Sequence, residues 1–119
     1  MRSVVLPLIV LNLGFAPAPV YREKRASPRH LAGHWVVEFA NGVVETCEVR
    51  ADGTASVVEP ARSSKGKTAA KGSAVVITFD DDRVERWSGS GASVMVEHWF
   101  PASRYPAGPS VVGTARRMP

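Results

Sequence analysis

Residues 31–54 read LAGHWVVEFANGVVETCEVRADGT, and this stretch decides the fold. Its first part alternates in side-chain character with a period of two, which indicates a β-strand with one face turned toward a core. Asn41-Gly42 follows directly, and both residue types accept the positive φ angles that a two-residue hairpin turn requires. Asp52-Gly53 repeats this signal at the far end of the next strand. The stretch therefore predicts a strand, a tight turn, a second strand and another tight turn.

Alternation of the same kind continues toward the end of the chain. It predicts further strands at residues 43–51, 54–59, 74–79, 83–88, 92–100 and 111–116. In the first of these, Glu45 falls on the same face as Cys47, so that inner face is not wholly apolar. The lysine-rich residues 61–73 are either a long loop or a loop with a weak strand near residues 68–70, because plain loops of more than about 12 residues are uncommon.

No helical period is long enough to form a crossover between parallel strands. The short, sequential connections instead favour antiparallel neighbours. Because a meander removes its exposed edges by closing on itself, the pattern predicts a barrel. The expected fold is all-β, an antiparallel up-and-down meander of seven to eight strands closing into a small barrel over residues 31–117.

Length and composition set the limits of this domain. A chain of 119 residues is enough for one domain, and 45% hydrophobic with 22% charged residues is typical of a globular protein. The net charge of +4 favours anionic surfaces but carries no information about the fold. Cys47 is the only cysteine, so the domain has no internal disulfide.

Residues 1–18 have the pattern of a secretory signal peptide. Met1-Arg2 provides a positive start, residues 4–15 form an apolar run, and Ala16-Pro17-Ala18 supplies small residues of the kind that signal peptidase reads. The run is too short to cross a membrane, and no other long apolar run is present, so we expect no transmembrane segment. The alternative is a buried N-terminal strand. We interpret the segment as an export signal, which predicts a secreted or periplasmic protein.

Residues 19–30 are expected to form a basic flexible linker, since no apolar periodicity is found there. A basic arm can bind anionic lipid, glycan or nucleic acid, but such charge runs are more often solvated chain. Because we expect the protein to be exported, nucleic acid is not an expected partner. The sequence does not indicate an oligomeric state.

Gly33-His34-Trp35, at the start of the first strand, resembles the opening motif of lipocalin-like (calycin) barrels, and the Asn-Gly and Asp-Gly-Thr turns resemble those of small exported bacterial proteins of this type. In that family a short turn of helix precedes the strand, and a basic residue from the last strand lies across the tryptophan. The resemblance implies this role for Arg116 or Arg117, with Gly33, Trp35 and Arg116 as the structural residues. A guanidinium stacked on an indole face is a favourable cation–π contact.

Catalytic and metal sites are not predicted. His30 and His34 would lie about 13 Å apart in a strand, too far to share a metal ion. Cys47 and His98 form a nucleophile and a base only if their strands are neighbours and face alike, and a lone cysteine in a strand is more often a core residue. The three aspartates at 80–82 fit a solvated turn better than a calcium site. No phosphate loop, zinc-type cysteine pair or nucleophile elbow is present, so we expect a non-enzymatic protein without a cofactor or metal.

Aromatic residues in the second half of the chain are the candidates for a ligand site. A barrel of this size has little room for three tryptophans, so at least one is expected at a pocket mouth or in an exposed patch. The candidate ligand-binding residues are Trp87, Trp99, His98 and Met95.

Two functions of different classes fit these observations. The first is an exported binding module that holds an apolar small ligand or a protein partner. The alternative is a structural or interaction protein whose barrel is filled by side chains and has no ligand cavity, as is usual for small barrels. An inhibitor of exported proteases is a third possibility, although no motif supports it. The volume enclosed by the sheet separates the first two.

The export signal predicts that the mature protein begins near Pro19. Expression in a host with a periplasm, followed by N-terminal sequencing of the soluble protein, should show that residues 1–18 have been removed. Recovery of soluble protein that still begins with Met1 would contradict the signal.

Overall fold

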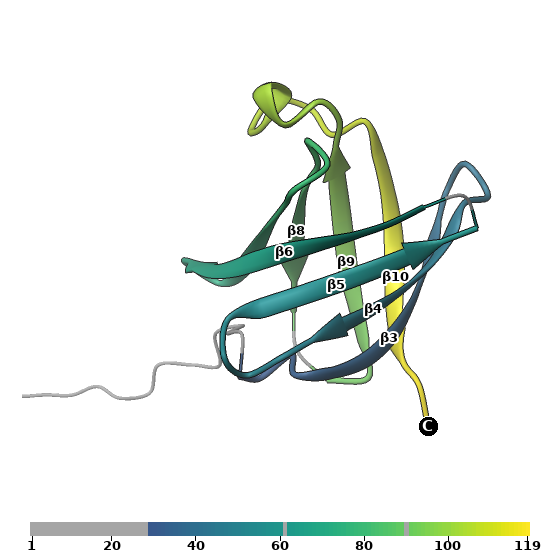
Figure 1. The fold of residues 1–119 in the computed structure, drawn as a ribbon, viewed down its shortest axis with the longest axis vertical. Coiled ribbons are helices and arrows are strands. Elements are labelled where there is room, and N and C mark those ends of the chain that lie inside the picture. The colour runs from purple at the N-terminus through teal and green to yellow at the C-terminus, as the bar shows by residue number, and fades with distance from the viewer. Residues whose placement is uncertain (1–28, 61, 90) are drawn as a thin grey trace, which may run out of the picture.

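In the computed structural model, which describes residues 29–60, 62–89 and 91–119, the chain forms a closed barrel of eight antiparallel strands (Figure 1). Each strand pairs with the next one along the chain, and β10 pairs with both β9 and β3, which closes the sheet. The strands are β3 (Gly33–Phe39), β4 (Val44–Val49), β5 (Thr54–Glu59), β6 (Arg62–Lys71), β7 (Ala74–Phe79), β8 (Val84–Ser88), β9 (Ser93–Trp99) and β10 (Val111–Arg117).

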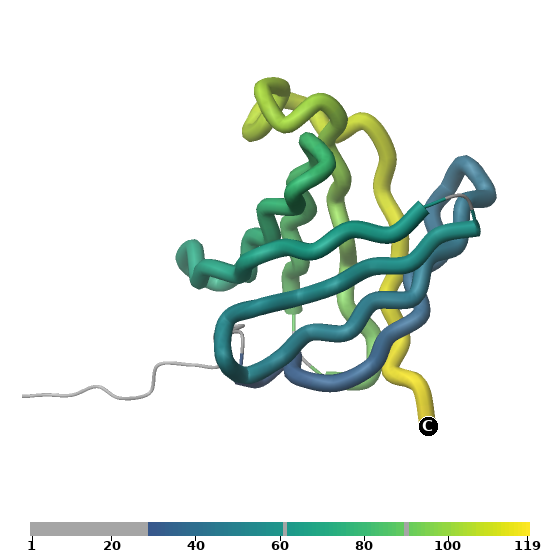
Figure 2. Tube along the Cα trace, in the orientation of Figure 1, coloured from purple at the N-terminus to yellow at the C-terminus, as the bar shows by residue number. Residues whose placement is uncertain are grey.

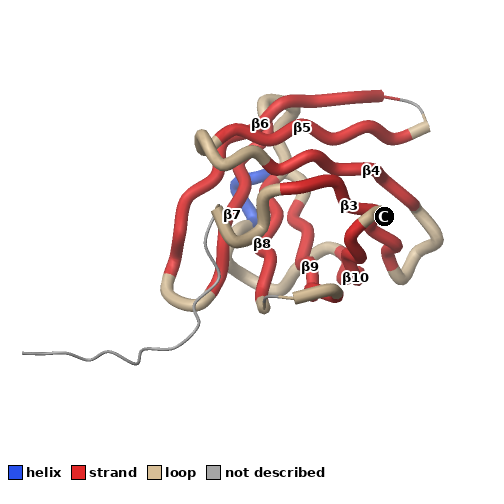
Figure 3. The backbone as a smooth tube through the Cα atoms, turned by 90° about the horizontal axis from the view of Figure 1, so that it is seen from below, coloured by secondary structure: helices blue, strands red, loops and turns tan. Residues whose placement is uncertain are grey.

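This architecture confirms the all-β antiparallel meander, closed into a barrel, that the sequence predicts. Figures 2 and 3 show the sheet curving round on itself, with a longer connection between β9 and β10 than between the other neighbouring strands. The expected signal peptide and nearly all of the basic linker lie outside the described residues. None of the helices in the described ranges is long and apolar enough to cross a membrane.

β6 is the element whose nature the sequence leaves open, and it is a full strand that pairs with β5 on one side and β7 on the other. Its inward positions hold Ser64, Gly66 and Thr68, which give no apolar signal. The space beside Gly66 is filled by Phe79 of the neighbouring strand, because a Cβ at Gly66 would lie 2.9 Å from the Phe79 ring. Small inner residues on β6 thus make room for a large one on β7.

The interior of the barrel is packed with apolar side chains. Trp35 and Trp87 are fully buried and meet edge to face, with ring centroids 5.5 Å apart. Trp35 Nε1 donates a hydrogen bond of 2.9 Å to the carbonyl of Leu31, so the polar end of the buried indole is satisfied. The core consists of Leu31, Trp35, Val37, Phe39, Cys47, Val49, Ala55, Val57, Val75, Ile77, Phe79, Trp87, Val94, Val96 and Ala115.

The end of the barrel near Trp35 is sealed by Arg117. The guanidinium carbon lies 4.4 Å from the centre of the Trp35 ring. Nη1 donates to the carbonyl of Ala32 at 2.9 Å and Nη2 to that of His30 at 2.8 Å. Gly33 has a φ of +143°, and a Cβ there would come within 2.7 Å of Arg117 Nη1. The glycine of the opening motif therefore leaves space for the arginine that covers the tryptophan.

The structure corrects the choice of Arg116 for this position, since Arg117 occupies it. Successive residues of a strand point to opposite faces of the sheet. Arg116 points outward, where its Nη1 lies 3.6 Å from Glu38 Oε1 on the neighbouring strand.

A second, smaller core lies on the outer face of the barrel. The chain between β9 and β10, which includes the short 3-10 helix η2 (Ala102–Arg104), folds over this face (Figure 1). The second core consists of Val76, Val84 and Trp99, packed against Ala102 and Tyr105. Trp99 meets Tyr105 edge to face at 4.8 Å and donates from Nε1 to the carbonyl of Ala107 at 2.8 Å.

Arg117→Ala should lower the free energy of unfolding by about 1–2 kcal/mol more than Arg116→Ala, because it removes a cation–π contact and two charge-assisted hydrogen bonds. Urea denaturation followed by tryptophan fluorescence measures both effects. Arg116→Ala is the matched control, since it breaks only an exposed ion pair worth about 0–1 kcal/mol. Equal losses in the two variants would mean that Arg117 adds nothing to closure.

Candidate functional site

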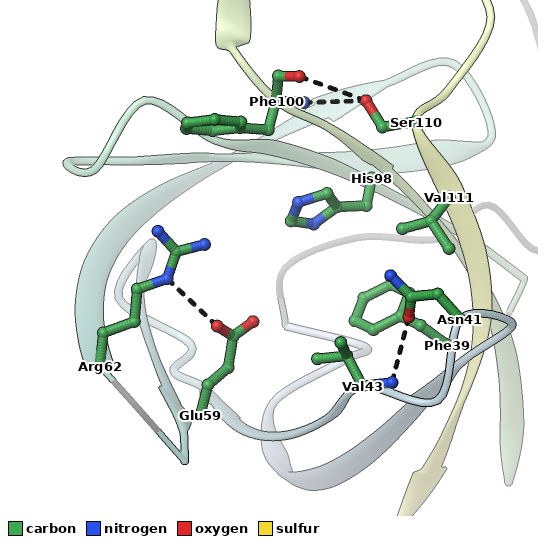
Figure 4. Close-up of a pocket in the computed structure, with 9 residues that line it drawn as sticks. All are labelled: Phe39, Asn41, Val43, Glu59, Arg62, His98, Phe100, Ser110 and Val111. Atoms are coloured by element: carbon green, nitrogen blue, oxygen red, sulfur yellow. Dashed lines mark hydrogen bonds and ion pairs between the residues drawn. The ribbon is translucent and has the colours of Figure 1, made fainter.

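A pocket of about 270 Å³ opens at the end of the barrel opposite Trp35 (Figure 4). It forms where the β3–β4 turn, the β5–β6 connection and the adjoining ends of β9 and β10 come together. Its walls are Phe39, Asn41, Val43, Glu59, Arg62, His98, Phe100, Ser110 and Val111. In a meander, alternate turns lie at the same end of the barrel, and this topology brings segments distant in sequence to one opening.

Apolar side chains form much of the pocket wall. The Phe39 ring meets the His98 ring edge to face, with centroids 5.4 Å apart. Phe100 is 49% exposed, a large fraction for a phenylalanine, and it lies 6.0 Å from the guanidinium carbon of Arg62. Val43 and Val111 complete the apolar surface. An exposed phenylalanine beside a hollow is typical of a surface that receives an apolar group.

His98 is held rigidly at the floor of the pocket by Glu85. His98 Nδ1 lies 3.1 Å from Glu85 Oε2, and Glu85 Oε1 accepts a hydrogen bond of 3.0 Å from Trp87 Nε1. With Glu85 Oε2 as the acceptor, Nδ1 carries a hydrogen, and Nε2 makes no hydrogen bond within the described residues. The buried carboxylate therefore fixes both the ring orientation and the atom that His98 can offer to a ligand.

A buried arginine, Arg83, lies below the pocket and neutralises the acids around it. Its Nε donates to both carboxylate oxygens of Asp81, at 3.0 and 2.9 Å, and its Nη1 to Glu59 Oε2 at 2.7 Å. Nη2 donates to Ser64 Oγ at 3.0 Å. The guanidinium also lies 5.2 Å from the Phe79 ring. A fully buried charge is tolerated here because every donor group of the arginine has a partner.

Glu45 is the member of this cluster that lacks such support. It is 1% exposed, neither carboxyl oxygen accepts a hydrogen bond, and its nearest cation is Arg83 Nη1 at 3.5 Å. Burial, together with the neighbouring Glu85 and Glu59, raises the pKa of Glu45 to about 11 against the opposing charge of Arg83. Glu45 is therefore a neutral acid at physiological pH.

The neighbours of Glu45 are shifted in ways that follow from their surroundings. Burial, with Glu85 and Glu45 nearby, raises the pKa of the Cys47 thiol well above its usual range. Burial acts in the same direction on Glu59, but the protonated Glu45 and the charges of Arg83 and Arg62 outweigh it and lower the pKa of Glu59. In the folded protein, Cys47 is thus a thiol and Glu59 a carboxylate.

Of the four candidate ligand-binding residues, the structure places only His98 at this pocket. Trp87 is fully buried in the main core, and Trp99 is fully buried in the second core on the other side of the sheet. Met95 is 47% exposed on the outer face, where it borders a separate shallow hollow with Arg86. The period of two separates Met95 and Trp99 from His98, because residues 95 and 99 point outward from the barrel and residue 98 points inward.

The other pocket residues are not among the ligand-binding residues that the sequence predicts. Most of them lie at the ends of strands or in turns, where alternation gives no signal. In a meander, alternate turns meet at one end of the barrel, and this rule places the segments around residues 41, 60 and 110 together. The inward acid Glu45 was visible as an exception to the apolar face. Among the described residues, no group of His, Cys, Asp and Glu side chains is placed to hold a metal ion.

No protein-family model, curated protein or solved structure matches this chain. The geometry and chemistry of the pocket are therefore the basis for inferring its function.

Glu45 should make stability fall as pH rises. The unfolded chain releases this proton above the ordinary carboxyl pKa, whereas the folded protein keeps it, so the stabilisation is complete below that pKa and declines toward pH 11. Glu45→Gln keeps nearly the same side-chain shape but removes the ionisable carboxyl group. The variant should raise the free energy of unfolding at about pH 8 by about 1–3 kcal/mol and flatten its decline between about pH 5 and 9.

Chemical denaturation across this pH range provides the measurement, and Glu48→Gln is the control. Glu48 is on the same strand but its side chain is 40% exposed, so its loss should change little. Glu59, with its lowered pKa, loses its contribution only in more acidic solution, outside this window. A Glu45→Gln protein less stable than wild type at pH 8 would show that Glu45 is ionised in the fold.

Proposed function

We propose that the protein is an exported, non-enzymatic binding module that holds a small molecule in the mouth pocket of a lipocalin-like barrel. The observation that carries this proposal is the pocket itself, in which apolar walls surround His98, whose ring is fixed by Glu85 and whose Nε2 is left without a partner. Small-molecule sites are typically apolar hollows with a few oriented polar groups of this kind.

The size of the pocket limits the ligand. Ligand pockets commonly enclose about 300–1,000 Å³, and this one, at about 270 Å³, lies just below that range. The interior below it is occupied by core side chains and by the Arg83 cluster. A long lipid chain therefore has no room inside the barrel, and a compact molecule at the mouth fits better.

Two further features support the lipocalin-like barrel and the export that the proposal includes. Gly33, Trp35 and Arg117 are arranged as the lipocalin-like resemblance implies, with the arginine stacked on the indole. The apolar run and small residues at positions 4–18 support export. Cys47 is compatible with an oxidising compartment, because a single buried cysteine offers no exposed thiol for cross-linking.

The filled interior also favours a second candidate function, a structural barrel with no ligand. Trp35, Trp87 and Ile77 are all fully buried, as expected for a barrel whose side chains occupy its volume. Such a protein would act through its outer surface. The mouth pocket distinguishes the two candidates, because only the binding module uses it.

A screen of small neutral, anionic and cationic fragments against the isotope-labelled protein tests the proposed function. Binding should shift the backbone amide NMR signals of the pocket walls and leave those near Trp35 unchanged. Val43→Trp should abolish binding, because the larger side chain fills the pocket. Val112→Trp is the matched control, since both valines are 39% exposed but Val112 is outside the pocket.

If no fragment shifts the pocket signals, or if binding survives Val43→Trp, the binding-module proposal is wrong. The structural-barrel alternative would then be the better description.

A further inference from the structure

Some polar groups of the mouth pocket already make hydrogen bonds within the protein, and others do not. Both oxygens of Glu59 are occupied: Oε2 accepts from Arg83 at 2.7 Å and Oε1 from Arg62 Nε at 3.2 Å. The Ser110 hydroxyl accepts from the Phe100 amide at 3.2 Å and donates to the Phe100 carbonyl at 3.3 Å. The carboxylate of Glu59 and the hydroxyl of Ser110 are thus already engaged within the protein, and Figure 4 shows the Arg62–Glu59 and Ser110–Phe100 contacts.

Donor groups of the same pocket remain unused. Arg62 engages only its Nε, so its Nη1 and Nη2 make no hydrogen bond to the described residues. Asn41 accepts from the Val43 amide through Oδ1 at 3.1 Å, and this leaves its Nδ2 amino group without a described partner. Figure 4 shows Arg62, Asn41 and His98 around one open space. Arg62 and Asn41 therefore offer N–H donors that an acceptor group of a ligand can use.

The Nε of Arg62 already pairs with Glu59 and lies 3.9 Å from Asp81 Oδ2, but its unused Nη1 and Nη2 favour an anionic acceptor over a neutral or cationic one. Arg62 is cationic and 46% exposed, and its planar guanidinium fits the two oxygens of a carboxylate. Glu45, which would repel an anion if it were ionised, is neutral in the fold. An ammonium group would instead meet Arg62 and find both oxygens of Glu59 occupied.

The apolar walls define the rest of the ligand. Phe39, Phe100, Val43 and Val111 line the same small hollow, and the filled barrel below prevents a long chain from entering. We propose that the mouth pocket binds a small monocarboxylate with a compact apolar body. Its carboxylate is received by Arg62 and Asn41, and its body lies against the phenylalanine and valine side chains. This inference rests on the proposed function and specifies its ligand class.

Three planar probes of nearly equal shape test the charge preference: benzoate, benzamide and benzamidine. Affinities are measured by NMR titration of the full folded domain in a buffer free of carboxylates. Benzoate should bind about tenfold more tightly than benzamide, because only benzoate pairs its charge with Arg62. Benzamidine, which is cationic, should bind the most weakly of the three.

Variants of the pocket then assign the preference to named residues. Arg62→Gln should weaken benzoate binding about tenfold and change benzamide binding little. Asn41→Asp keeps an acceptor for the Val43 amide but replaces the free donor with a negative charge, so it should also weaken benzoate. Arg116→Gln is the control, because Arg116 is exposed on the outer face beside Glu38. A thermal melt of each variant verifies that it is folded.

The outcomes separate this inference from the proposed function. Tighter binding of benzamidine or benzamide than of benzoate, or benzoate binding that is unchanged in Arg62→Gln, overturns the carboxylate assignment and leaves the pocket as a small-molecule site. Failure of all three probes while other fragments bind at the mouth also overturns the assignment. Failure of every fragment removes the proposed function as well.

Discussion

The pairing of β10 with β3 is the interaction on which the rest of the structure depends. It converts an open meander into a ring and leaves no unpaired edge among the eight described strands. The same register sets Arg117 opposite Trp35 and Gly113 opposite Phe39. A Cβ on Gly113 would lie 2.6 Å from the Glu38 carbonyl oxygen and 2.7 Å from the Phe39 ring, so this glycine permits the close approach. One pairing thus closes the sheet, seals one end and orients a wall of the pocket at the other.

The two ends of the barrel differ in chemistry, and this asymmetry favours a function at the open end. Trp35, Trp87 and aliphatic side chains fill the sealed half. The open half instead holds Arg83 with several carboxyl groups, although burying charges costs more than packing apolar groups in the same volume. A barrel selected only for stability has no need of this cluster. Below a pocket, however, it fixes Arg62 through Glu59, and the neighbouring Glu85 fixes His98.

The fold was largely predictable from sequence, because alternation and the Asn-Gly and Asp-Gly turns are local signals. The sequence leaves β6 open between a loop and a weak strand near residues 68–70, because its inner residues are small and polar and their space is filled by Phe79 from the next strand. The burial of Trp99 depends on a cover from residues 100–110, which the period of two cannot reveal. The pocket was missed because Asn41, Arg62 and Ser110 meet only when alternate turns are brought to one end. The sequence signals for the fold are local, whereas the residues of the site are distant in sequence and are brought together only by the topology of the barrel.

The reactivity of the Cys47 thiol reports how often the barrel opens. The sulfur is almost completely buried and its pKa is raised, so the reactive thiolate is scarcely present while the sheet is closed. Reaction with a thiol reagent must therefore wait for β4 to separate from a neighbouring strand, and its rate measures how often the ring opens. In an oxidising medium, a covalent dimer would contain only molecules that had passed through such an opening. The single cysteine is thus unreactive in the native protein, and its modification marks molecules that have transiently unfolded.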